Sequence, residues 1–175
     1  MRLFIAIPLD NVVKDHLIKL QEHIGSSDAK IAWISKKNMH ITLKFLGEVK
    51  DTKKIQEALK KVKAKKMTIH LTNFSTFPKQ DPRVLYIAVE PEDKLRKLAQ
   101  EVDAETIHIQ EDKPFVAHIT LGRIKQVKFP QDFKRKQETL EIHPLQLIIN
   151  KFQLVTSKVT SAGSDYKVVE EYQLE

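Results

Sequence analysis

The chain contains no cysteine and no long apolar run. The lack of cysteine excludes disulfide bonds, thiolate metal sites and cysteine nucleophiles together. No stretch reaches the ~18 apolar residues that a membrane-spanning helix needs. The N-terminus lacks the basic, apolar and small-residue segments of a secretion signal in that order. We therefore expect a cytoplasmic protein that makes no use of a membrane.

The chain does have enough apolar residues for a core, together with an excess of positive charge. Its 175 residues are 41% hydrophobic, which suits one domain or two small lobes. The formal net charge of +7 favours an anionic partner, with nucleic acid first. Because a basic balance also serves solubility, charge alone does not define that partner.

The sequence His-Ile-Thr-Leu occurs twice, beginning at His40 and at His118. In each copy polar and apolar residues alternate, and the apolar ones are β-branched or bulky, which predicts a β-strand. Side chains two residues apart on a strand point to the same face. We therefore expect His40 to share a face with Thr42, and His118 with Thr120, while the isoleucine and leucine of each copy anchor the strand in a core.

The same order of elements surrounds both copies: strand, helix, strand, His-Thr strand, helix, strand. Alternation and apolar runs extend the second His-Thr strand over 115–124 and predict further strands over residues 3–7, 31–34, 67–74, 83–90, 106–109, 140–155 and 166–174. Helical spacing and capping residues predict helices that follow Asp10 and Asp51 and helices that begin at Pro91 and Pro130.

We interpret this order as an internal duplication within a single domain, 1–175, of the α+β class. The approximate halves are 1–76 and 83–175, related by a pseudo-two-fold axis. Antiparallel sheets with helices outside would then enclose a central cleft between two lobes. Both His-Thr faces are expected to line that cleft.

Two imidazoles that face one substrate can act as general acid and general base, because histidine titrates near neutral pH. The threonine hydroxyls can donate hydrogen bonds to phosphoryl oxygens. Hydrolysis of a phosphodiester uses this combination of groups, and it requires no metal and no cofactor. A metal site built on His40 and His118 would lack further ligands, since no matched carboxylate or histidine accompanies them.

The paired motifs resemble the two HxTx motifs of the 2H phosphoesterases. The resemblance is closest to the RNA 2′,3′-cyclic phosphodiesterase branch, historically called 2′-5′ RNA ligases. The sequence departs from the family pattern at Gly122, directly after the second motif, where alanine or a similar small residue is frequent. We expect this difference to have little effect on the chemistry. The supporting stretches are Arg2–Ile7, Lys44–Gly47, Pro114–Phe115, Arg123, Ser157, Gly163 and Tyr166.

This resemblance implies a hydrolase that opens a 2′,3′-cyclic phosphate at an RNA 3′ end to a 2′-phosphomonoester. His40 would donate a proton to the departing 3′ oxygen, and His118 would accept a proton from the attacking water. Thr42 and Thr120 would hold the phosphate. The expected partners are RNA 3′ ends with a cyclic phosphate, including those of tRNA fragments, and the expected state is a monomer.

Three further residues are candidates for substrate binding. Lys44 is four positions after the first histidine and is expected on the same face, where it either reaches the phosphate or is a solvated lysine. Strict alternation points Arg123 away from the second histidine, so a twist or bulge is needed to bring it to the substrate. Trp33 is a candidate for stacking on a terminal base. We expect Phe45 on the core side of its strand.

Three other functions remain open. The enzyme could run in the ligase direction and join tRNA halves through a 2′-5′ bond. It could be a non-catalytic RNA-binding module, or a 2H enzyme for a small cyclic nucleotide such as ADP-ribose 1″,2″-cyclic phosphate. A third His-x-Thr triplet begins at His70. Because it lies outside the duplicated order, we expect it to be structural or at most on the rim of the cleft.

Overall fold

The computed structural model describes residues 1–106, 109 and 114–175. Part of the predicted strand over 106–109 therefore lies outside the described residues. The elements in chain order are β1 (Arg2–Pro8), α1 (Asn11–Ile24), β2 (Ala29–Trp33), the short 3-10 helix η1 (Lys36–Asn38), β3 (His40–Glu48), α2 (Thr52–Leu59), β4 (Met67–Phe77), β5 (Val84–Glu90), α3 (Glu92–Glu105), β6 (His118–Val127), α4 (Pro130–Thr139), β7 (Gln146–Ile149), β8 (Lys151–Thr160) and β9 (Gly163–Gln173).

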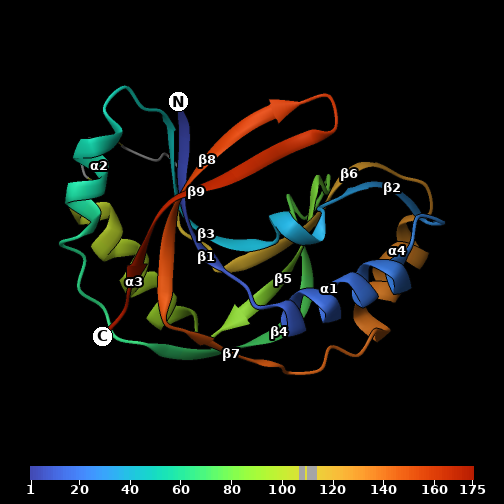
Figure 1. Ribbon diagram of the computed structural model, residues 1–175. Coiled ribbons are helices and arrows are strands. Elements are labelled where there is room, and N and C mark those ends of the chain that lie inside the picture. Colours follow the sequence, from blue (N-terminus) through green and yellow to red (C-terminus); the bar gives the residue numbers. More distant parts are fainter. Residues whose placement is uncertain (107–108, 110–113) are drawn as a thin grey trace.

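The strands form one curled sheet in the order β7-β4-β5-β6-β3-β1-β8-β9, and β2 pairs with β6 (Figure 1). Every pairing between these strands is antiparallel. The predicted α+β class is confirmed, and the structure joins the two predicted sheets into one. The strand predicted over 140–155, which Pro144 was expected to break, is in fact two strands, β7 and β8, separated at Asn150.

Helices α1, α2, α3 and α4 each bury apolar side chains in one core, on the face of the sheet that holds Ile41 and Ile119. Helix α1 illustrates how the sequence produces this arrangement. The Asp10 side chain accepts a hydrogen bond from the Val13 amide at 2.9 Å and caps the helix, as predicted. The helix ends at Gly25, whose φ of 59° suits glycine. Helices therefore cover one face of the sheet and leave the motif side chains on the other.

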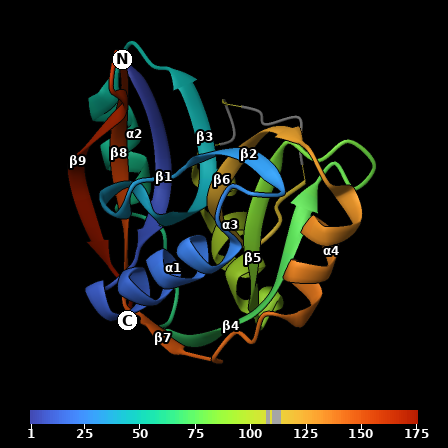
Figure 2. The same cartoon turned by 90° about the vertical axis from the view of Figure 1, so that its right-hand side faces the viewer.

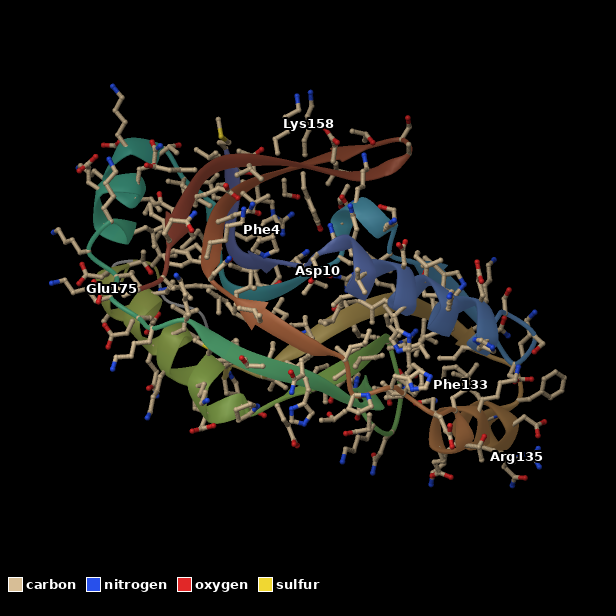
Figure 3. All side chains as sticks on the ribbon, turned by 60° about the horizontal axis from the view of Figure 1, so that its bottom comes forward. Phe4, Asp10, Phe133, Arg135, Lys158 and Glu175 are labelled. Carbon is tan, nitrogen blue, oxygen red and sulfur yellow. The ribbon has the colours of Figure 1, made fainter. Side chains whose placement is uncertain are left out.

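We call this other face, which holds the histidines and threonines of both motifs, the histidine face. A small apolar cluster of Phe4, Ala6 and Val155, with Tyr166 packed against it, lies there. Figure 3 shows Phe4 among the strands, in the interior of the molecule. The hairpin of β8 and β9 extends beyond the rest of the sheet next to η1 (Figure 1). The sheet thus has an aromatic lining beside the motifs.

Strand pairings cross between the two halves of the sequence. Strand β8 pairs with β1, and β4 pairs with β5 and β7. Each half of the sheet is therefore completed by strands from the other half of the chain. The predicted division into 1–76 and 83–175, and the predicted cleft, stay predictions. Within the described residues, no helix is long and apolar enough to cross a membrane.

Candidate active site

The two motif strands lie next to each other at the centre of the sheet. Ile41 of β3 pairs with Ile119 of β6, and both are fully buried in the core. Neighbours across an antiparallel pair share a face, and faces alternate along each strand. The residues on either side of this pair, which include His40 and His118, therefore lie together on the histidine face. Burial is the main cause of the lowered pKa of His40, and the charge of His118 lowers that pKa further.

The backbone fixes the orientation and tautomer of the His40 ring. Its Nδ1 lies 2.7 Å from the carbonyl oxygen of Asn38. A carbonyl only accepts hydrogen bonds, so Nδ1 carries the proton and donates it. Nε2 of the neutral ring is then an acceptor, and the Thr42 hydroxyl donates to it across 2.9 Å. Nε2 is thus the nitrogen left for proton transfer.

His118 is held in the same way. Its Nδ1 donates to the carbonyl oxygen of Val116 at 2.7 Å, again the residue two positions earlier. Its Nε2 is therefore the proton-transfer atom, as in His40. Thr42 and Thr120 are both half-buried on the histidine face. The two motifs are therefore equivalent both in sequence and in the hydrogen bond that orients each imidazole ring.

Two aromatic rings pack against each histidine. The ring centroids of Phe4 and Tyr166 lie 5.0 and 5.6 Å from that of His40. Those of Tyr86 and Phe77 lie 5.2 and 5.6 Å from that of His118. Apolar rings displace water from an imidazole and thereby disfavour its charged form.

Burial is the main reason why both histidines have lowered pKa values. It lowers the pKa of His40 from 6.5 to about 4, opposed by the hydrogen bond to Asn38 and reinforced by the charges of His118 and Lys14. Burial also lowers the pKa of His118, opposed by the hydrogen bond to Val116. Both rings of the free protein are consequently neutral near pH 7, and each presents an unprotonated Nε2.

A bulge follows the first motif and reverses the predicted directions of two residues. Thr42 pairs with Ala6 of β1, but Lys44 pairs with Ile5, so one extra residue stands between them on β3. Lys44 turns into the core, is 3% exposed, and forms an ion pair with Asp103 of α3. The prediction that Lys44 shares the face of the first histidine is therefore wrong.

Lys44 has enough partners to explain its burial. Besides the ion pair, its ammonium group donates to the backbone carbonyl and to the hydroxyl of Thr106, each at 3.1 Å. The bulge also moves Phe45 to the histidine face, where it pairs with Phe4 and is 55% exposed. The expectation that Phe45 faces the core was wrong for the same reason.

An equivalent bulge follows the second motif. Thr120 pairs with Tyr86 of β5, and Gly122 pairs with Leu85, which again leaves one extra residue on the motif strand. Arg123 then pairs with Val84, which shares a face with Tyr86, the residue packed against the second histidine. The bulge that Arg123 needed to reach the histidine face is present, and Arg123 is exposed there. Its role in substrate binding stays a prediction.

Trp33 packs against the main core and not on the histidine face. It is half-buried against the main core and pairs with Gly122. A Cβ atom on Gly122 would lie 2.4 Å from Ile31 Cγ2 and 3.1 Å from Trp33 Cε3. The contact with β2 therefore explains why glycine stands at this position, and the placement of Trp33 does not support base stacking.

Sequence reasoning missed several residues that shape the site. Asn38 positions the first histidine through its carbonyl, and its side chain donates to the carbonyl oxygen of Ser164 on β9 at 2.7 Å. Aligning the first strand of each half could have shown Phe4 and Tyr86 as equivalent aromatics. No local pattern indicated Asn38 or Phe77. The third triplet has a structural contact, in which the Thr72 hydroxyl donates to the carbonyl oxygen of Ala88.

The described residues contain no group of three or more histidine or carboxylate side chains that could hold a metal ion. The arrangement on the histidine face is instead suited to proton transfer. It offers two acceptor nitrogens, hydroxyl donors beside them, and a guanidinium group further along β6.

Comparison with known proteins identifies the family of the chain. The model of the family described as LigT-like phosphoesterases matches the chain twice in succession, over residues 7–86 and 87–164, which confirms the duplication. A protein of Thermotoga maritima named RNA 2′,3′-cyclic phosphodiesterase is 33% identical over 183 residues, covering 100% of this chain and 96% of that one. A protein of the same name from Archaeoglobus fulgidus is 34% identical, covering 95% and 97%.

The fold also has a solved counterpart. The crystal structure of the Thermus thermophilus protein TT0787 matches with a TM-score of 0.80 and 26% identity, covering 99% of this chain and 97% of that one. Together with the two family-model matches and the relatives that span nearly its whole length, this shows that the chain belongs to the LigT-like phosphoesterase family, a branch of the 2H phosphoesterases.

Proposed function

We propose that this protein is an RNA 2′,3′-cyclic phosphodiesterase that hydrolyses a terminal cyclic phosphate to a 2′-phosphomonoester by acid-base catalysis with His40 and His118. The observation that carries the proposal is the pair of imidazoles on one face of the sheet, each with Nδ1 bound to a carbonyl and Nε2 left for proton transfer. The name shared by relatives across nearly the whole chain supports the choice of substrate.

In this mechanism Nε2 of His118 accepts a proton from water, and the resulting hydroxide attacks phosphorus. The bond from phosphorus to O3′ breaks, and Nε2 of His40 donates a proton to the departing O3′. The products are a 3′ hydroxyl and a 2′-phosphate. Because His40 is neutral in the free protein near pH 7, it takes up its proton together with the substrate, whose phosphodiester anion raises the pKa of a nearby imidazole.

The threonines would stabilise the phosphoryl oxygens during this reaction. Thr42 already directs its hydroxyl at Nε2 of His40, so protonation of that nitrogen frees the hydroxyl to donate to a non-bridging oxygen. Thr120 occupies the equivalent position on β6. The guanidinium of Arg123 on the same face can pair with the phosphate charge. Lys44 and Trp33 have no part in the proposal, because both pack against the core.

The test is an assay with an oligoribonucleotide that ends in a 2′,3′-cyclic phosphate, performed in excess EDTA, with the position of the product phosphate determined. The proposal predicts a 2′-phosphate and turnover that EDTA does not reduce. A 3′-phosphate product, or loss of turnover on chelation, would contradict the reaction as written. The monomeric state, the cytoplasmic location, and the use of tRNA fragments stay predictions.

A further inference from the structure

A second feature of the surface lies at the C-terminal end of β6, beyond the motif residues. A hollow of about 1030 Å³ is bounded by β4, the loop between β4 and β5, the end of β6, and α4. Figure 2 shows α4 next to β4, with the loop between β4 and β5 beyond their ends. Its lining includes four cationic side chains, Lys79, Arg83, Lys125 and Lys134. We call this hollow the α4 groove.

The charge of the α4 groove is positive and partly uncompensated. Its lining holds two carboxylates, and each already has a cationic partner: Asp81 lies 2.7 Å from Arg83, and Glu138 lies 3.8 Å from Lys134. Lys79 and Lys125 have no ion-pair partner within the part of the chain that the structure describes. Both are exposed, so their ammonium groups are available to an anionic ligand.

The α4 groove begins two residues beyond Arg123 on β6, at Lys125. Arg123 and Lys125 are both exposed, on either side of the buried Ile124, and a bulge at Lys125 redirects β6 where it reaches the groove. Strand rise places Lys125 roughly 20 Å from His118 along the strand. A polynucleotide whose 3′ end reaches the histidines can therefore pass Arg123 and enter the groove with its next few phosphates.

We propose that the α4 groove binds the single-stranded part of the RNA that lies upstream of the reacting 3′ end. This inference rests on the proposed function, because it takes RNA as the substrate. Cations that follow a phosphate backbone are the general means of binding single strands without sequence preference. The amide of Gln126 in the lining adds a group that can hydrogen-bond to sugars and base edges, and the amides of Asn73 and Gln137, which donate to backbone carbonyls, add acceptor oxygens.

One wall of the α4 groove is firmly attached to the protein. Phe133 is 3% exposed and fixes α4 to the core. Figure 3 shows Phe133 on the side of α4 toward the strands and Arg135 on its outer side. The core therefore holds this wall of the groove in place.

The test compares two double variants of the full chain. Lys79→Gln with Lys125→Gln removes the two unpaired cations of the groove. Lys53→Gln with Lys61→Gln makes the same change of net charge with exposed lysines at α2, at the other end of the molecule (Figure 1). Any effect of overall charge appears equally in both variants, whereas an effect of the groove appears in the first alone.

The first measurement is the affinity for a ten-nucleotide RNA ending in a 2′-phosphate, by fluorescence anisotropy at several salt concentrations. Because the groove variant lacks two cations that pair with phosphates, it should bind about tenfold more weakly, and the slope of log K against log salt should become shallower by about 1.4. The second measurement is hydrolysis. The groove variant should raise KM for a ten-nucleotide cyclic phosphate and leave KM and kcat for a dinucleotide cyclic phosphate unchanged.

Equal affinity of the two double variants for the ten-nucleotide RNA would overturn the role of the groove, even if wild type hydrolyses both substrates. Selective loss of affinity in the groove variant, with no hydrolysis by wild type, would support the groove and refute the proposed reaction. An equal rise of KM for both substrate lengths would also overturn the groove, because a dinucleotide is too short to reach it.

Discussion

Replacing His40 with asparagine should make the protein less sensitive to mild acid. The pKa of His40 is about 4 in the folded chain and 6.5 in a model peptide, which approximates the unfolded chain. Between these values the unfolded chain binds a proton at this residue and the folded chain does not. The folded state therefore loses stability as pH falls below 6.5, and this loss stops growing below about pH 4.

The magnitude follows from the two pKa values. Each unit of pKa difference is worth about 1.4 kcal/mol. Integrated from pH 7 to pH 5, the His40 contribution lowers the free energy of unfolding by about 2 kcal/mol. For a chain of this size that change corresponds to a shift of about 4–8 °C in Tm. Other groups also titrate in this range, and the difference between wild type and His40→Asn removes them.

The assay is urea unfolding of wild type and His40→Asn at pH 7 and pH 5. The variant should gain about 2 kcal/mol relative to wild type at the lower pH. A control, His23→Asn, replaces a histidine exposed on α1 and should keep the wild-type dependence. If wild type and His40→Asn lose the same stability between these pH values, the burial of a neutral His40 is refuted.

Three further predictions concern catalysis and packing. The profile of kcat/KM against pH should be bell-shaped with its maximum below pH 6.5, because both histidines have lowered pKa values; a maximum at or above pH 7 in steady-state assays would count against this. Lys44→Met should cost about 2 kcal/mol of stability in urea unfolding and leave kcat/KM nearly unchanged. Arg123→Ala should instead raise KM about tenfold. A raised KM in Lys44→Met with an unchanged KM in Arg123→Ala would place Lys44 at the substrate. Gly122→Ala should cost about 1–3 kcal/mol, since its Cβ would overlap the Ile31 side chain. Combining it with Ile31→Ala should give less than the sum of the two losses, and strict additivity would exclude the clash.

The fold was largely predictable from local patterns. Caps and periodicity were sufficient for α1, where Asp10 and Gly25 mark both ends. The repeated His-Ile-Thr-Leu predicted two equivalent strands, and the single pair of Ile41 with Ile119 places them side by side. Nothing in the alternation of residues indicated that the two strands would belong to one continuous sheet, because strand pairing between distant segments depends on tertiary packing.

The directions of residues after the motifs could not be predicted, because one extra residue in each strand inverts every later side chain. This is why Lys44 faces the core while Phe45 and Arg123 face the histidines. A bulge has no distinctive residue pattern here, although its occurrence at the same place in both halves is itself a product of the duplication. The aromatic rings around the histidines come in part from distant strands, as Tyr166 on β9 shows.

The central claim is that two histidines act on one phosphoryl group in different roles. The most direct measurement uses a cyclic phosphate substrate in which sulfur replaces the bridging 3′ oxygen, because a sulfur leaving group departs without protonation. On the normal substrate, His40→Ala and His118→Ala should each reduce kcat by about 10²–10⁴-fold. The sulfur substrate should restore turnover in His40→Ala and not in His118→Ala. The account would be contradicted if both variants turned over the normal substrate at the wild-type rate. It would also be contradicted if the sulfur substrate restored turnover in His118→Ala alone.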